Sequence, residues 1–164
     1  MDEHPIIRVD PVNDSLCPAL LNLGVLPTQR EYMGDIADLL ADAVACPGAE
    51  PMAICHGDTP VGYYRIDPHP RSVAGHDFAV PALGLRTFFI DADWQGRGFG
   101  ALALNALIAD LAARHPLARL LVLTVNNNNH AASQLYRRAG FRARIGLYHD
   151  RRPGPEQLLL RALP

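Results

Sequence analysis

The chain has 164 residues, of which 49% are hydrophobic and 20% charged, a composition typical of a globular protein with one buried core. No apolar run approaches the roughly 20 residues that span a bilayer, and the acidic N-terminus lacks a signal-peptide pattern, so we expect a single cytoplasmic domain over residues 1–164 without a membrane segment. Three cysteines without close spacing predict reduced thiols and no metal site, and the formal net charge is −2.

Charge is divided unevenly between the two halves of the chain. Residues 1–82 hold 4 Arg against 12 Asp and Glu, whereas residues 83–164 hold 11 Arg against 5 acidic residues. The first half therefore suits a cationic ligand and the second half an anionic one. The alternative is that folding spreads these charges over the surface regardless of their order in the chain.

The first half of the chain predicts a short strand, two helices and a hairpin. Ser15 and Thr28 are suitable N-caps for the helices, and Glu31 completes a capping box with Thr28. Gly57-Asp58 between two apolar runs is a strong hairpin signal. The strands are expected at residues 6–9, 52–56 and 61–66. The apolar face of the second helix is expected to carry Met33, Ile36, Ala37, Leu40 and Val44.

The second helix also carries an acidic stripe. Its members are spaced at i, i+4, i+7 and i+11, so they share one helix face; they are Glu31, Asp35, Asp38 and Asp42. Such a stripe is commonly a solvated surface. The more specific interpretation is a wall that attracts a cationic substrate.

The second half of the chain predicts a long loop followed by strands that alternate with helices. The loop covers residues 67–81, and loops of this length within compact domains are often functional. The elements expected after it are a strand at 85–90, a helix that ends at Pro116, a strand at 120–125, a helix at 130–139 stopped by Gly140, and closing strands at 142–148 and 157–162.

A glycine-rich turn connects the strand at 85–90 to the helix that follows it. The sequence Gln95-Gly96-Arg97-Gly98-Phe99-Gly100 leaves main-chain N–H groups unshielded at a helix start, where free donors and partial positive charge favour a phosphate. Arg97 adds a full positive charge. Two better-known phosphate loops fit less well, because the chain has no lysine for a P-loop and its glycines lack the G-x-G-x-x-G spacing of a Rossmann turn. A turn that only redirects the chain is the alternative.

A second polar constellation begins where the strand at 120–125 ends. Asn129 and Tyr136 are seven residues apart, which is two helical turns, so both side chains lie on one face of the short helix. An aromatic residue in such a position is commonly part of the core. The alternative is a functional pair at the start and on the face of this helix.

Together the two segments resemble the GCN5-related N-acetyltransferase (GNAT) superfamily. Residues 95–100 match its Q/R-x-x-G-x-G/A acetyl-CoA motif, and residues 129–141 match its N-x-x-A-x-x-L-Y-x-x-x-G-F element. The order of the predicted elements agrees over nearly the whole chain. The resemblance implies an α/β (α+β) fold with a central mixed, mostly antiparallel twisted sheet of about six to seven strands, flanked by about four helices.

The resemblance also assigns roles to individual residues. In such enzymes the turn holds the CoA pyrophosphate, and the preceding strand pairs with the pantetheine arm and polarises the acetyl carbonyl through main-chain groups. The cofactor-binding residues implied here are Phe88, Phe89, Ile90, Gln95, Gly96, Arg97, Gly98, Phe99, Gly100 and Asn129. Tyr136 is implied as the acid that protonates the leaving thiolate, so it is the expected catalytic residue.

The general base is left open by the sequence. Many relatives use a Glu on the strand that enters the turn, but residues 83–90 contain no acid. The other residues that could accept the proton or bind the acceptor amine are Glu31, Asp35, His76 and Asp77. For each of them an ordinary surface position is the alternative.

The expected function is acetyl transfer from acetyl-CoA to a primary amine of a small, polyamine-like cation by direct attack in a ternary complex. The alternatives are a non-catalytic acetyl-CoA sensor or regulatory module and an enzyme that acetylates a protein or aminoacyl-tRNA amine. Nucleic acid is not an expected partner, because the arginines of the second half are scattered with few interleaved aromatic residues. A homodimer formed through the closing strands stays open.

Overall fold

The chain forms two compact units that are connected through strand β4 (Ala82–Ile90) and helix α5 (Phe99–Arg114). The computed structural model describes residues 7–13, 17–21, 23, 36–75, 78–126, 129–143 and 156–164. Unit 1 comprises residues 1–66 and 87–110, and unit 2 comprises residues 67–86 and 111–164. Each unit has its own packed interior.

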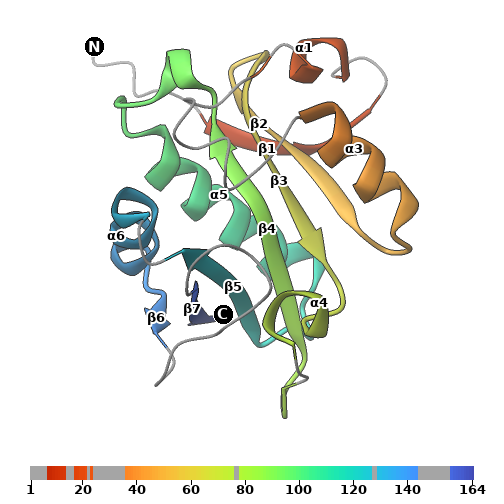
Figure 1. Cartoon of the computed structure of the whole chain (residues 1–164), viewed down its shortest axis with the longest axis vertical. Coiled ribbons are helices and arrows are strands. Elements are labelled where there is room, and N and C mark those ends of the chain that lie inside the picture. Colours follow the sequence, from red (N-terminus) through yellow and green to blue (C-terminus); the bar gives the residue numbers. More distant parts are fainter. Residues whose placement is uncertain are drawn as a thin grey trace. The chain divides into compact units, whose positions relative to one another are not determined.

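Unit 1 is built on an antiparallel meander. Strand β1 (Ile7–Pro11) pairs with β2 (Glu50–His56), which pairs with β3 (Thr59–Asp67). The predicted hairpin is confirmed, because Gly57 turns the chain between β2 and β3 with a positive φ of 60°. Helices α1 (Cys17–Leu21) and α3 (Ile36–Ala45) pack against each other, and α3 also packs on β2 (Figure 1).

The buried face of α3, the second predicted helix, differs from the predicted apolar face. Leu40 and Ala43 are buried, whereas Val44 is 83% exposed. The core cluster combines residues from both helices and the strands, namely Leu20, Leu40, Ala53, Cys55, Tyr63 and Phe89. Val44 is exposed because it lies in the last turn of a helix whose contact face runs through positions 40 and 43.

The end of β4 and the start of α5 complete unit 1. Gly62 on β3 has no side chain because a Cβ there would come within 2.4 Å of the Phe89 carbonyl oxygen. A short 3-10 helix (Ala92–Trp94) follows β4, and α5 begins at Phe99. The predicted apolar face of α5 is confirmed by the burial of Leu104, Leu107, Ile108 and Leu111.

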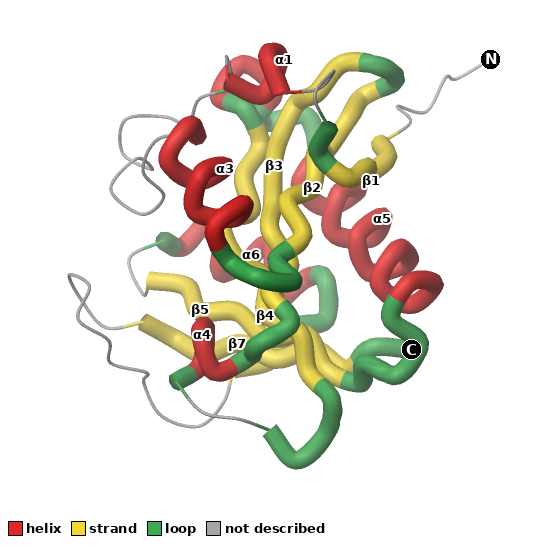
Figure 2. Tube along the Cα trace, turned by 90° about the vertical axis from the view of Figure 1, so that its right-hand side faces the viewer, coloured by secondary structure: helices red, strands yellow, loops and turns green. Residues whose placement is uncertain are grey.

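Unit 2 is built on β5 (Leu120–Asn126), which pairs in parallel with β4 over Ala82–Gly84 and antiparallel with β7 (Glu156–Ala162). Strand β6 (Arg142–Ala143) pairs with the far edge of β7. The predicted loop at 67–81 contains a one-turn helix, α4 (Arg71–Ala74), and α4 contacts β5 (Figure 2). This helix was not predicted, because Pro68 and Pro70 indicate a loop although proline is tolerated at a helix start.

The strand order is β1-β2-β3-β4-β5-β7-β6, a seven-stranded mixed sheet. Strands β4 and β5 pair in parallel, whereas β1–β2, β2–β3, β5–β7 and β6–β7 pair antiparallel. This confirms the expected fold class. The four predicted helices correspond to α1, α3, α5 and α6 (His130–Arg138), and α4 is additional. Among the described helices, none has the length and hydrophobicity needed to cross a membrane.

Candidate functional site

The glycine-rich turn between β4 and α5 exposes its backbone. Gly96 and Gly98 adopt positive φ angles of 78° and 80°, and a Cβ placed on either would meet no atom within 4 Å. The backbone from Gly96 to Gly98 is exposed immediately before the first residue of the 16-residue helix α5. The turn therefore presents main-chain donors at a helix N-terminus to open space, as an anion-binding site requires.

Hydrogen bonds fix the position of this turn on the end of β4. The Gln95 side-chain amide Nε2 donates to the Ile90 carbonyl oxygen at 2.8 Å, which closes the chain across the 3-10 helix. The Asp91 N–H donates to the Val61 carbonyl oxygen at 2.7 Å and so joins the end of β4 to β3. We infer that Gln95 contributes to the turn by bracing it.

An aromatic cluster supports the turn from within unit 1. The rings of His56, Trp94 and Phe99 lie with centroids 5.2 to 5.8 Å apart in each pairing. The Arg97 guanidinium lies over the Trp94 ring at 4.9 Å, a cation–π contact, and donates to the Asp93 carbonyl oxygen at 3.4 Å. Sequence reasoning missed His56, because a contact across more than forty residues leaves no local pattern.

The three predicted residues of β4 are held by their side chains in the interior. Phe88, Phe89 and Ile90 are all buried. Phe88 packs near Tyr64 and Phe89 near Tyr63, with ring centroids 6.4 and 6.2 Å apart. Side-chain burial leaves only the main chain of this segment for a ligand, which is the role the resemblance implies.

The second motif forms helix α6 in unit 2. Asn129 is its N-cap, and the Asn129 side-chain oxygen accepts a hydrogen bond from the Ala132 N–H at 3.4 Å. Gly140 ends the segment with a φ of 96°, and the Phe141 N–H donates to the Tyr136 carbonyl oxygen at 3.0 Å. Asn129 thus has an observed structural role at the helix start beside its predicted contact with CoA.

Tyr136 lies on the buried side of α6. Its side chain is only 8% exposed, and its ring meets Phe141 edge-on with a centroid distance of 5.6 Å. Burial disfavours the charged phenolate and raises the pKa of Tyr136 well above its ordinary value. The phenol therefore keeps its proton at neutral pH, as a proton donor must.

The predicted site residues divide between the two units. Phe88 to Ile90 and Gln95 to Gly100 lie in unit 1, joined by the Gln95–Ile90 hydrogen bond, whereas Asn129 and Tyr136 lie in unit 2 on one helix. The other four residues fall outside the described part of the chain, namely Glu31, Asp35, His76 and Asp77.

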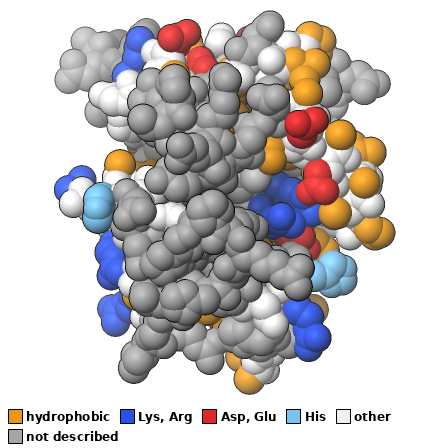
Figure 3. Space-filling view, viewed as in Figure 1, with side chains coloured by type: hydrophobic (Ala, Val, Ile, Leu, Met, Phe, Trp, Pro, Cys, Tyr) orange, Lys and Arg blue, Asp and Glu red, His pale blue; other side chains and the backbone are white. Residues whose placement is uncertain are grey.

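The described part of the acidic stripe is not a uniform surface. Asp42 accepts a hydrogen bond from Arg65 Nη1 at 2.6 Å, and the Arg65 side chain is only 3% exposed. In the space-filling view, acidic side chains in the region of α3 adjoin basic ones (Figure 3). Asp42 therefore compensates a buried arginine, while Asp38 on the same helix is exposed.

Replacing Asp42 with alanine should lower the free energy of unfolding by roughly 1–3 kcal/mol, because the buried Arg65 charge loses its carboxylate partner. Asp38→Ala is the matched control on the same helix and should change stability by less than about 0.5 kcal/mol. Chemical denaturation of both variants measures the difference. Equal stability of the two variants would show that the Asp42–Arg65 pair contributes nothing.

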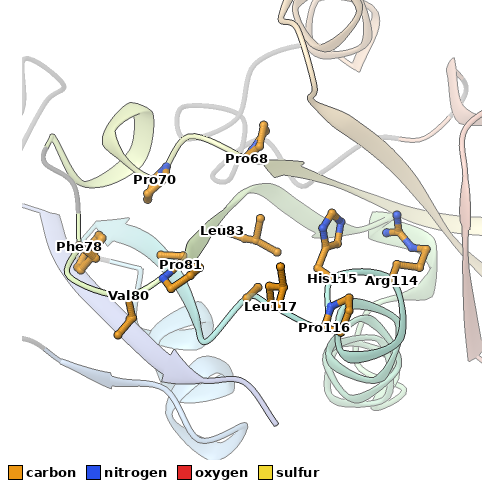
Figure 4. Close-up of a pocket in the computed structure, with 12 residues that line it drawn as sticks. Pro68, Pro70, Phe78, Val80, Pro81, Leu83, Arg114, His115, Pro116 and Leu117 are labelled. Carbon is orange, nitrogen blue, oxygen red and sulfur yellow. The ribbon is translucent and has the colours of Figure 1, made fainter.

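One pocket in unit 2 lies apart from all these residues. It has a volume of about 600 Å³ and is mostly apolar; Figure 4 shows Leu83 between the prolines of residues 68–70 and the segment from His115 to Leu117. It contains none of the predicted site residues. Its titratable lining residues are Arg114 and His115, and neither belongs to the two sequence motifs.

Comparison with known proteins identifies the family of the chain. Residues 17–141, which include the turn, α5 and α6, match the acetyltransferase (GNAT) family. The chain belongs to the acetyltransferase (GNAT) family. It is accordingly an acyltransferase of the N-acetyltransferase class.

Individual GNAT proteins are similar to this chain in sequence or in structure. The spermine/spermidine N(1)-acetyltransferase of Bacillus subtilis (strain 168) is 32% identical over 135 residues, which cover 82% of this chain and 87% of that protein. Aminoglycoside acetyltransferase AAC(6')-Ib in complex with coenzyme A has a TM-score of 0.77 at 19% identity, covering 96% of this chain and 95% of that one. A Salmonella typhimurium acetyltransferase that modifies the N-terminal serine of a 50S ribosomal subunit protein has a TM-score of 0.70 at 16% identity, covering 96% and 95%. The two structures show that the GNAT fold is shared.

Proposed function

We propose that this GNAT enzyme transfers the acetyl group of acetyl-CoA to a primary amine of a small, polyamine-like cation. The observation that carries the proposal is the exposed turn at the start of α5, where Gly96 and Gly98 leave room for a ligand against the main chain. The turn fits a diphosphate because its donors are unshielded and Arg97 adds positive charge beside them. We also propose that residues 1–164 act as one domain, because β4 and α5 run through both units.

The turn, β4 and α6 would each bind a different part of acetyl-CoA. The N–H groups between Gln95 and Gly100 would hold the pyrophosphate, and the main chain of Phe88 to Ile90 would lie along the pantetheine arm and polarise the acetyl carbonyl. Asn129 would contact CoA from the start of α6. Holding both reactants in one complex can lower the barrier by roughly 7–11 kcal/mol.

Transfer requires two proton movements that protein groups must manage. The ammonium would give a proton to a base, for which Glu31, Asp35, His76 and Asp77 are the candidates. The neutral nitrogen then attacks the carbonyl carbon, so that a C–N bond forms and the C–S bond breaks. The Tyr136 phenol would donate its proton to the leaving sulfur. Its buried, protonated state suits that step, and a positioned acid contributes on the order of 10²–10⁴-fold.

The acceptor is proposed to be a polyamine on two grounds. The relative from Bacillus subtilis that is 32% identical is a spermine/spermidine N(1)-acetyltransferase, and the first half of this chain carries 12 acidic residues against 4 Arg. The exposed Asp38 on α3 is one carboxylate available to attract such a cation.

The experiment is a steady-state assay of the full chain with acetyl-CoA and a panel of amines. We expect spermidine or spermine to have the highest kcat/KM, above kanamycin and a peptide with an N-terminal serine. Release of free thiol measures turnover, and mass spectrometry locates the acetyl group. Preference for the aminoglycoside or the peptide would contradict the polyamine acceptor. Binding of acetyl-CoA without turnover of any amine would instead support a sensor.

A further inference from the structure

Thr87, in the middle of β4, has a backbone conformation that its residue type avoids. Its φ is +54°, in the left-handed region, although Thr87 is β-branched and lies within a strand. Such a residue costs of order 1–3 kcal/mol and persists only where the surrounding structure holds it. The segment it precedes, Phe88 to Ile90, is the one proposed to lie along the thioester.

The chain elsewhere relieves this kind of strain with glycine. Every other described residue with a positive φ is a glycine, namely Gly48, Gly57, Gly75, Gly96, Gly98 and Gly140. Glycine at position 87 would adopt the same angle without a steric penalty. The presence of threonine therefore indicates that the side chain contributes something that glycine cannot.

The hydroxyl group is what distinguishes this side chain. Thr87 Oγ1 is buried and has no hydrogen-bond partner among the described residues. A buried hydroxyl without a partner costs about 1–3 kcal/mol, and each such group in a native protein calls for an explanation. Strain and an unsatisfied hydroxyl thus coincide in one residue, next to the proposed reaction centre.

We propose that the Thr87 hydroxyl donates a hydrogen bond to the carbonyl oxygen of the bound acetyl group. The inference rests on the proposed function. An acetyl group brings one oxygen with lone pairs, which can accept the hydrogen bond that Thr87 Oγ1 does not make among the described residues.

This hydrogen bond would strengthen during the reaction. The carbonyl oxygen gains negative charge as the amine attacks, so a fixed donor stabilises the transition state more than the bound substrate. Removing one such donor from an acyl-transfer site costs about 10²–10³-fold in kcat. The strained backbone would hold the donor in place before the substrate arrives.

Three variants separate the hydroxyl from the strain. Thr87→Val keeps the branching and the strain but removes the hydroxyl, and we expect kcat to fall by about 10²-fold. Thr87→Ser restores the hydroxyl and should keep kcat within roughly fivefold of the wild type, since only the methyl is lost. Thr87→Gly removes both features, so it should raise the melting temperature while losing activity like the valine variant.

Affinities for acetyl-CoA and CoA, measured by calorimetry, provide a readout that needs no turnover. CoA lacks the acetyl oxygen, so Thr87→Val should leave its Kd unchanged and weaken acetyl-CoA selectively. The ratio of the Kd for acetyl-CoA to the Kd for CoA tests the role of Thr87 even if no amine is acetylated. Absence of acetylation would overturn the proposed function but not the role of Thr87 in binding the acetyl group.

Several outcomes would overturn the role of Thr87. Wild-type kcat and an unchanged affinity ratio in Thr87→Val would mean that a water or another group satisfies the hydroxyl. A loss in Thr87→Ser equal to that in Thr87→Val would point to packing of the methyl. If Thr87→Val fails to fold, the serine and glycine variants decide, because the proposal requires serine to be active and glycine to be inactive.

Discussion

Replacing Gly98 with alanine is expected to weaken acetyl-CoA binding at least about tenfold, with a matching rise in its KM. The φ of Gly98 is +80°, an angle that costs alanine roughly 1–2 kcal/mol. Its Cβ would project into open space where the phosphates are proposed to bind. Either the turn shifts to relieve the strain or the methyl group shields the main-chain donors. Isothermal titration with acetyl-CoA measures the loss.

Gly57 provides a matched control for the strain. It too has a positive φ, +60°, and a Cβ there would meet no atom within 4 Å, but it lies in the β2–β3 hairpin. Gly57→Ala should lower the melting temperature about as much as Gly98→Ala while leaving the Kd for acetyl-CoA unchanged. If both variants bound acetyl-CoA like the wild type, the turn would not be the pyrophosphate site.

The elements that sequence reasoning predicted well are those with local chemical signals. The turn at Gly96 and Gly98 and the helix ending before Gly140 were predictable because glycine is favoured at positive φ and its spacing is visible in the sequence. The buried face of α5 was predictable because helical periodicity marks it.

What sequence reasoning missed depends on contacts between distant segments. The pairing of Asp42 with the buried Arg65 spans 23 residues, and the contact of His56 with Phe99 joins β2 to α5. Neither residue type predicts its partner. Thr87 was missed for another reason, because its β-branched side chain indicates a regular strand and conceals the positive φ.

These omissions share a consequence for the reaction. The predicted motif residues explain where acetyl-CoA would bind, whereas contacts found only in the structure would hold the proposed site in place. Trp94 and His56 support the turn, and Thr87 carries strain beside the proposed thioester position. Preorganisation of this kind is what lets donors act in the transition state without rearrangement.

Tyr136→Phe is expected to lower kcat by about 10²-fold or more while the Kd for acetyl-CoA stays close to the wild-type value. The substitution keeps the ring packed against Phe141 and removes only the proposed proton donor. Tyr63→Phe is the matched control, because Tyr63 is a fully buried tyrosine of the unit 1 core. It should keep the wild-type kcat. Equal losses in both variants would mean that removing any buried tyrosine hydroxyl lowers kcat, so that Tyr136 is not the specific proton donor.

The pH dependence of the stability of the wild type and of Tyr136→Phe tests the burial of Tyr136 independently of activity. Burial raises the pKa of Tyr136, so above about pH 10, where an unfolded tyrosine loses its proton, the native protein binds more protons than the unfolded chain. Unfolding then becomes easier as pH rises, by up to about 1.4 kcal/mol for each pH unit from this one group. Tyr136→Phe lacks this loss, so denaturant midpoints at about pH 8 and about pH 11 should show the variant gaining on the wild type. An equal change of the midpoint with pH in both proteins would mean that the phenol of Tyr136 titrates with its ordinary pKa. A proton donor with an ordinary pKa would then suffice to protonate the thiolate.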